Sequence, residues 1–166
     1  MKRTFALILA AVGIGCLVAA VADDTQTKPK TAKEAGMANA HSAVVSVRYM
    51  IDDVDAAVAF YTNHLGFTLE VDSAPAFAAV ARGNLRLLLS GEKSSGRRAL
   101  PDGSKPVPGS WNRILLPVSD IQAEAARLRA AGVKFRRDDI VSGPGGSQIW
   151  VVDPSGNLVE LFQPKK

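Results

Sequence analysis

The chain has 166 residues, of which 47% are hydrophobic and 22% charged, and its formal net charge is +4. This length fits one domain, or two small halves that share one core. The charge is too low to make nucleic acid an expected partner, because nucleic-acid-binding domains carry strong basic patches.

The first 22 residues differ in composition from the rest of the chain. Residues 1–3 are basic at two positions, and an almost unbroken apolar run then ends in Ala20-Val21-Ala22, directly before two aspartates. A basic start, an apolar stretch and small residues before the cut are typical of a secretory signal peptide. We therefore expect cleavage after Ala22 and a periplasmic or secreted mature protein.

Two alternatives to cleavage are open. The apolar run is nearly long enough to be an inner-membrane anchor, and Cys16 could carry the lipid of a lipoprotein. Cys16 is the only cysteine, so a cleaved protein would have no disulfide and would depend on its core for stability. Residues 23–41 are polar without periodicity and are predicted to form a flexible linker.

Residues 42–90 are predicted to form a first module of strand, helix and three strands. In the helix, apolar side chains recur at helical spacing before Gly66. The expected elements are a strand over 43–51, a helix over 53–66 and strands over 67–71, 77–82 and 85–90.

A connector rich in Gly, Pro and Ser, residues 91–110, leads to a second module over residues 111–164. Its expected elements follow the same order: a strand over 113–118, a helix over 120–132 and strands over 133–141, 147–153 and 157–163. A repeat of this size indicates that the fold is built from two copies of one unit. It predicts an α+β domain of two βαβββ modules over residues 42–166.

A six-residue stretch occurs once in each module. GNLRLL (83–88) and GNLVEL (156–161) share Gly, Asn, Leu and the final Leu, and aligning them places Leu87 opposite Glu160. A carboxylate is costly to bury on an otherwise apolar strand. Glu160 therefore needs a partner or a function.

Three stretches, DVDAAVAFYTNHLGF, WNRILLPVSDIQAEAARLRAAG and DPSGNLVELFQP, resemble the vicinal oxygen chelate superfamily. That superfamily contains glyoxalase I, extradiol dioxygenases, fosfomycin-resistance enzymes and bleomycin-resistance proteins. The resemblance covers about residues 42–164 and implies curved mixed sheets around one shared cavity, with the helices outside. It implies no single reaction, because the superfamily hosts many chemistries and some binding proteins.

The resemblance also implies where a divalent ion would bind. The first and last strands of each module commonly supply the ligands, which corresponds here to Ser46, Leu87, Arg113 and Glu160. Only Glu160 is a family-type ligand, because the others offer a weak donor, no donor and a fixed positive charge. We expect no metal or other cofactor, and the alternative is a divalent ion held by an atypical set of ligands around Glu160.

Strand alternation places Glu160 on one face of its strand and Arg113 on one face of another. If both faces line the cavity, the guanidinium meets the carboxylate where the ion would be. An internal salt bridge without a ligand is one interpretation. The other is a site for a polar or anionic small molecule, formed by Arg113, Glu160, Arg48, Ser46 and Trp111. Both Trp111 and Trp150 fit either the cavity wall or the core.

The sequence thus predicts an exported small-molecule-binding protein without the usual metal site. The alternative is a metal-dependent lyase, isomerase or dioxygenase of the glyoxalase type that uses Glu160. A third class is a structural or partner-binding protein with an unused cavity. The paired Arg136 and Arg137 are predicted to be solvated surface residues. Ligand identity is open, and so is the formation of a homodimer.

Overall fold

The computed structural model describes residues 44–166. The predicted signal peptide (residues 1–22), the predicted linker (23–41) and residues 42–43 lie outside the described residues. Within the described part, no helix is long and apolar enough to cross a membrane.

The first module is a four-stranded sheet with one helix. Its elements are β1 (Val45–Met50), α2 (Val54–Leu65), β2 (Thr68–Ser73), β3 (Phe77–Arg82) and β4 (Leu85–Ser90). The strand order is β1-β4-β3-β2, with β1 parallel to β4. The Asp53 side chain caps α2 by accepting a hydrogen bond from the Ala56 N–H, and Gly66 ends the helix at a φ of 69°.

The second module repeats this order in a five-stranded sheet. Its elements are β5 (Arg113–Pro117), α3 (Ile121–Ala130), β6 (Lys134–Phe135), β7 (Val141–Gly143), β8 (Gly146–Val152) and β9 (Leu158–Pro164). The order is β5-β9-β8-β6, and β7 pairs with β8. The side chain of Asp120 caps α3 as that of Asp53 caps α2, so these two aspartates align the modules.

One predicted strand is wrong. Residues 133–141 contain only the short strand β6 (Lys134–Phe135) and the first residue of β7 (Val141–Gly143), with a bend between them. The four consecutive charged residues 136–139 are exposed, and Arg137 folds back on Asp139 through two hydrogen bonds of 2.8 and 2.9 Å. A run of charges offers no apolar face for a strand to bury, which explains the interruption.

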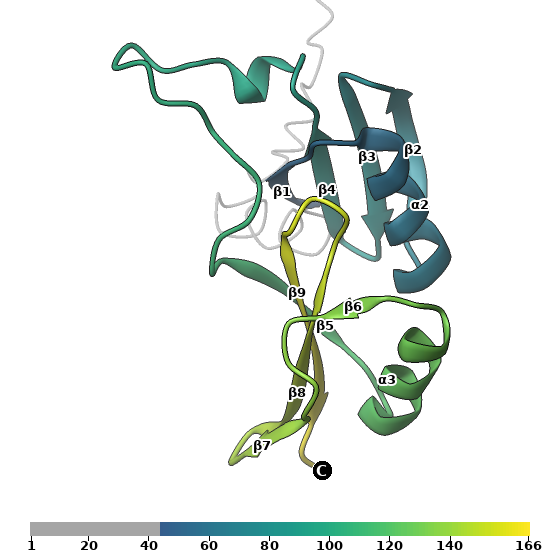
Figure 1. Cartoon of the computed structure of the whole chain (residues 1–166). Helices are drawn as coiled ribbons and strands as arrows, with labels where there is room; N and C mark the ends of the chain where they lie inside the picture. Colours follow the sequence, from purple (N-terminus) through teal and green to yellow (C-terminus); the bar gives the residue numbers. More distant parts are fainter. Residues whose placement is uncertain (1–43) are drawn as a thin grey trace, which may run out of the picture.

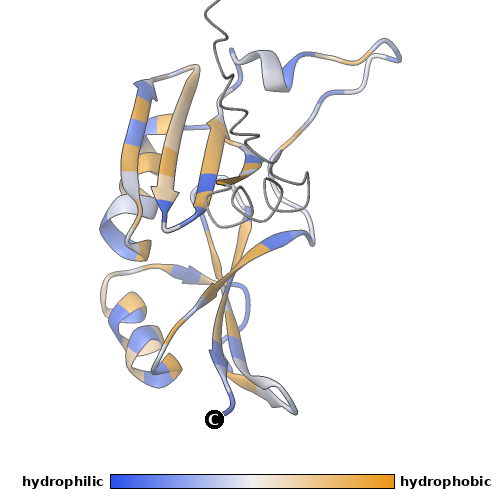
Figure 2. Ribbon diagram, turned by 180° about the vertical axis from the view of Figure 1, so that it is seen from behind, coloured by the Kyte–Doolittle hydropathy of each residue, from blue (hydrophilic) through white to orange (hydrophobic). Residues whose placement is uncertain are grey.

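The two helices lie on the same side of the two sheets (Figure 1). One apolar cluster fills the space between helices and sheets, with Tyr61 of α2 and Leu128 of α3 fully buried in it. Figure 2 shows the hydrophobic residues concentrated on the strands of both sheets. The predicted fold class, an α+β arrangement of paired βαβββ modules, is confirmed.

The turn between β8 and β9, residues 153–157, is organised around a buried carboxylate. Asp153 is 3% exposed and accepts hydrogen bonds from the main-chain N–H groups of Ser155 and Asn157. Its other oxygen accepts from Asn157 Nδ2 at 2.9 Å and from the Tyr61 hydroxyl at 3.1 Å. Because Tyr61 belongs to α2, this turn joins module two to module one.

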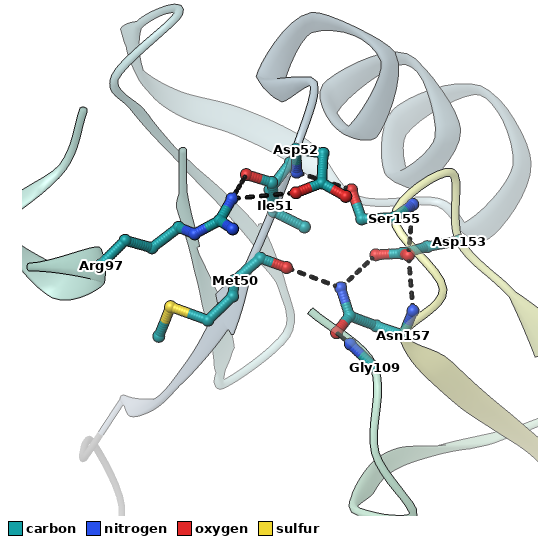
Figure 3. Close-up of polar contacts among 8 residues, drawn as sticks. All are labelled: Met50, Ile51, Asp52, Arg97, Gly109, Asp153, Ser155 and Asn157. Carbon is teal, nitrogen blue, oxygen red and sulfur yellow. Dashed lines mark hydrogen bonds and ion pairs between the residues drawn. The ribbon is translucent and has the colours of Figure 1, made fainter. Parts of the chain in front are cut away.

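Further hydrogen bonds cross the same junction (Figure 3). Asn157 Nδ2 donates to the Met50 carbonyl at 3.0 Å, and the Asp52 N–H donates to Ser155 Oγ at 2.9 Å. The Tyr49 hydroxyl lies between two main-chain groups of module two: it donates to the Leu158 carbonyl and accepts from the Ile114 N–H. Hydrogen bonds from side chains to main chain therefore help to hold the modules together, in addition to the apolar cluster that both modules share.

The connector between the modules, residues 91–112, leaves the body of the molecule and returns (Figure 1). It contains the short 3-10 helix η1 (Ser95–Arg97). Near its start, Arg97 donates to the Ile51 carbonyl and to Asp52, and near its end the Gly109 N–H donates to Asn157 Oδ1 at 2.9 Å. Both ends of the connector are thus attached at the module junction.

The final hairpins of the two modules differ in loop length. Two residues, 83–84, join the paired ends of β3 and β4, whereas five residues, 153–157, join those of β8 and β9. Loop length fixes the register of a hairpin, and a shift of one residue moves every side chain to the other face. The Gly-Asn-Leu residues that the two stretches share, 83–85 and 156–158, therefore do not occupy equivalent positions in the two hairpins.

The predicted correspondence between Leu87 and Glu160 is wrong for this reason. Leu87 is fully buried on the helix side of β4, in the apolar core. When the modules are aligned on their helix caps, the pairing of Arg48 with Leu88 corresponds to that of Leu115 with Glu160. The counterpart of Glu160 in module one is therefore Leu88.

Candidate functional site

Arg113 and Glu160 meet on the face of the second sheet that points away from α3. Arg113 Nε donates to Glu160 Oε2 at 2.6 Å, and the two side chains are 28% and 8% exposed. The two residues lie on neighbouring strands, where Leu115 pairs with Glu160 and Arg113 is two residues before Leu115. The contact predicted from strand alternation is confirmed.

Trp150 forms a platform under this pair. It lies on β8 directly opposite Glu160 in the pairing with β9, and the guanidinium carbon of Arg113 is 4.1 Å from its ring centroid. Arginine stacks well on an indole because its cation is planar and weakly hydrated. The Trp150 Nε1 donor is buried and has no hydrogen-bond partner within the described chain.

Trp111 stands at the open side of the cluster. Its ring meets that of Trp150 edge to face, with 6.4 Å between centroids, and its carbonyl accepts a hydrogen bond from Arg113 Nη1. The residue is nevertheless 65% exposed. Trp111 therefore belongs to the wall of a surface site and not to the core, which decides between the two interpretations of this tryptophan.

Arg136 completes the cluster, and it is exposed at the surface as its sequence context predicts. Its main-chain N–H donates to the Trp150 carbonyl at 2.9 Å, which extends the pairing of β6 with β8 by one residue. Its guanidinium carbon is 5.4 Å from the Trp111 ring centroid. Ser110, Trp111, Arg136, Val152, Gly156 and Leu158 line a hollow of about 280 Å³.

The profile of the Glyoxalase/Bleomycin resistance protein/Dioxygenase superfamily matches residues 43–161. The chain belongs to this superfamily. No curated protein sequence matches the chain significantly.

Solved structures from the superfamily share the fold. TnmS3, an antibiotic binding protein from Streptomyces sp. CB03234, is 30% identical at a TM-score of 0.58, with 75% of this chain and 97% of that chain covered. Lactoylglutathione lyase from Agrobacterium tumefaciens is 23% identical at a TM-score of 0.57, with 74% and 93% covered. The fosfomycin resistance protein FosX from Listeria monocytogenes is 15% identical at 0.56, with 75% and 94% covered, and like the lyase it shows similarity of fold alone.

Members of this superfamily often bind a divalent metal ion, but the side chains at the corresponding positions do not fit one. They are Ser46, Leu88, Arg113 and Glu160, a set with one carboxylate and one fixed cation. The Oε2 atom of Glu160 already accepts a hydrogen bond from Arg113 Nε. Across residues 44–166, no three His, Cys, Asp or Glu side chains are grouped to hold a metal. This donor chemistry argues against the ion, and the absence of a cofactor remains a prediction.

The structure places the other two predicted ligand-binding residues in module one. Arg48 donates to the buried hydroxyl of Ser90 and lines a hollow of about 300 Å³ between β1 and the end of the connector. Ser46 is exposed on β1. Among the described residues, no hydrogen bond or ion pair links either of them to Arg113 or Glu160. Their role in binding stays a prediction.

Burial changes the titration of three side chains at the module junction. It raises the pKa of Tyr49 to about 12 and that of Tyr61 well above its usual range. It also raises the pKa of Asp153, although hydrogen bonds from Asn157, Ser155 and Tyr61 act in the opposite direction. In each case the apolar surroundings penalise the charged form. These groups lie outside the hollow beside Trp111, which is consistent with a structural role.

Proposed function

We propose that the protein binds a small molecule with a planar aromatic part in the hollow beside Trp111. The exposure of Trp111 carries this proposal, because a large aromatic side chain that is 65% exposed offers a stacking surface. Trp150 and Arg113 hold it from one side through an edge-to-face contact and a hydrogen bond to its carbonyl. A preformed aromatic wall with a few polar groups is typical of small-molecule sites.

The polar side chains that line the hollow, those of Ser110 and Arg136, support a ligand that carries oxygen atoms. The buried Trp150 Nε1 has a hydrogen to donate and no acceptor within the described chain, and such a donor is costly to leave unpaired. The guanidinium of Arg113 contacts the one family-type metal ligand, Glu160, which balances its charge. Trp150 does not line the hollow itself but packs edge to face against Trp111, which does, so the charge that a ligand can reach in the hollow is that of Arg136.

The similarity to TnmS3 supports a binding protein in preference to an enzyme. That structure is described as an antibiotic binding protein, and its description names no reaction. A protein that is 30% identical to this chain therefore uses the same fold for binding. For the present chain, we propose a binding role without a metal and leave the ligand's identity to experiment.

Tryptophan fluorescence tests this function directly, because Trp111 lines the hollow and Trp150, the only other tryptophan of the chain, packs against it. A panel of aromatic compounds should contain at least one that changes the emission saturably. Trp111→Ala should weaken its binding about tenfold, the value of one lost aromatic contact, while Leu100→Ala in the exposed connector serves as a control. A panel without any effect, or unchanged affinity in Trp111→Ala, would contradict the proposal.

The alternative is a metal-dependent lyase, isomerase or dioxygenase that uses Glu160. One observation favours it: Glu160 Oε1 makes no hydrogen bond within the described residues, so one carboxylate oxygen is available. Elemental analysis of the purified protein separates the two functions. A stoichiometric divalent metal that is lost in Glu160→Ala would replace binding by metal-dependent catalysis.

We further propose that the mature protein is exported and begins at Asp23, on the basis of the sequence pattern of residues 1–22. N-terminal sequencing of the native protein measures this. An intact Met1 in the cytoplasm would reject export, and lipid on Cys16 would instead identify a lipoprotein. Sedimentation of the mature chain measures whether it forms a homodimer.

A further inference from the structure

Two guanidinium groups lie at the aromatic cluster, and their charges are balanced differently. The charge of Arg113 is compensated by Glu160 at 2.6 Å. Arg136 takes part in none of the ion pairs of the described chain, which join other arginines to acidic residues. Its contact with Trp111 is a cation–π contact, which leaves the positive charge in place.

We propose that Arg136 selects an anionic ligand, and that the ligand is an aromatic carboxylate, sulfonate or phosphate ester. This inference rests on the proposed function and names the ligand class for the same hollow. Arg136 and Trp111 both line that hollow. An aromatic ring that stacks on Trp111 would therefore bring an acidic substituent within reach of the Arg136 guanidinium, which binds such oxygens in pairs.

Arg113 is not suited to this task, although sequence reasoning assigns it there. Its Nε donates to Glu160 and its Nη1 donates to the Trp111 carbonyl. An anion that approached this guanidinium would also approach the Glu160 carboxylate and be repelled by it. Arg113 thus orients Trp111 and Trp150, and Arg136 supplies the net positive charge.

The position of Arg136 is fixed by the sheet, whereas its side chain is exposed. The main-chain bond to the Trp150 carbonyl places it beside β8, on the same face as Trp150. Its neighbour Arg137 is paired with Asp139 at 2.8 Å and belongs to the exposed bend. Replacement of either arginine removes one positive charge, so Arg137 is a matched control for Arg136.

The test uses two probes of similar shape, anilinonaphthalene sulfonate and the uncharged N-phenylnaphthylamine, with the mature chain. The wild-type protein should bind the sulfonate more tightly. Arg136→Met should weaken sulfonate binding about fivefold, the value of one partly exposed ion pair, and should leave the neutral probe unchanged. Arg136→Lys should keep part of the preference, and Arg137→Met should keep all of it. Added salt should weaken sulfonate binding in the wild type more than in Arg136→Met.

Several results would overturn the inference. Equal losses in Arg136→Met and Arg137→Met would show that only overall charge matters. An unchanged preference in Arg136→Met that is lost in Arg113→Met would move the selecting cation to Arg113. If both probes bind equally well to the wild type, ligand binding stands and anion selection fails. If neither probe binds, the inference fails, and the proposed function is decided by the wider panel of aromatic compounds.

Discussion

The two modules share a framework but carry different chemistry on their sheets. Equivalent positions on the first strand, the third strand and the last strand hold Ser46, Ala79 and Leu88 in module one, and Arg113, Trp150 and Glu160 in module two. The helix-facing positions are apolar in both, as Leu87 and Leu89 of β4 and Val159 and Leu161 of β9 show.

The comparison shows which face of the fold is constrained by packing. Side chains toward α2 and α3 must fill one dense core, so they stay aliphatic in both modules. Side chains on the opposite face do not contact the helices, and that face can acquire a cation, a carboxylate and an indole in one module only. Function in a duplicated fold then belongs to particular residues of one copy.

The largest expected effect concerns the turns of the two modules. The module-two turn contains Asp153, which accepts hydrogen bonds from Tyr61, Ser155 and Asn157, whereas the module-one turn is the two-residue Gly83-Asn84 link. Asp153→Ala should lower the free energy of unfolding by about 3 kcal/mol, because it leaves buried donors unpaired. Chemical denaturation measures the change.

The matched control is Asp102→Ala, which removes an exposed carboxylate that accepts from Ser104 within the connector. It should have little effect on unfolding. Equal stability of the two variants would show that the turn of module two does not join the modules, and that the long turn is only a spacer.

The second effect is the dependence of module docking on pH. The chain has two tyrosines, Tyr49 and Tyr61, and each belongs to module one and bonds to module two. The pKa of Tyr49 is about 12 in the folded protein against 10.0 in the unfolded chain. Between these values the unfolded state binds fewer protons, so stability must fall as pH rises from about 10 to about 12, by about 2 kcal/mol for Tyr49.

Denaturation at a series of alkaline pH values measures this loss, and Tyr49→Phe should reduce its slope. Asp153 acts with the same sign at acidic pH: its raised pKa means that the folded state is favoured as pH falls toward the ordinary pKa of aspartate. Tyrosines of the native protein that ionise as readily as those of the unfolded protein would contradict the buried arrangement.

The third effect tests the Arg113–Glu160 pair, which has no counterpart in module one. Arg113→Met and Glu160→Leu should each cost about 2 kcal/mol, less than for a fully buried pair because Arg113 is 28% exposed. The double variant, with a leucine as at Leu88, should recover much of that loss. A double-mutant cycle by chemical denaturation measures the coupling.

The ion pair of Arg86 and Glu70 in module one is the control for this cycle. Its side chains are 41% and 34% exposed, so its coupling should be at most about 0.5 kcal/mol. Equal couplings in the two modules, or simple addition of the two module-two losses, would show that the Arg113–Glu160 contact has no special role there.

Much of the fold follows from the sequence because its signals are local. The strands over 77–82 and 85–90 begin and end as predicted, and both helices start at a capping aspartate. The contact of Arg113 with Glu160 is also predictable, since alternation puts both on one face and the fold makes their strands neighbours.

The errors concern features that local patterns do not determine. The burial of Leu87 depends on the length of the turn before β4. Because this turn is shorter than the one before β9, identical residues in the two strands take different positions in their hairpins. The exposure of Arg136 agrees with its predicted place at the surface, but its contact with the Trp111 ring depends on the bend after it and on pairing with Trp150. No sequence period indicates which of two adjacent arginines reaches an indole.

The connector gives the molecule the properties of a tethered complex. The two sheets have separate strand orders, and residues 91–112 keep module two near module one at an effective concentration of the order of millimolar. A cut in the exposed stretch 101–105 would turn docking into a bimolecular reaction. Fragments at micromolar concentration would then reassemble only if the junction around Asp153 binds with a micromolar or better dissociation constant. Proteolysis of this loop would therefore lower the concentration of one module that the other experiences, from millimolar to micromolar.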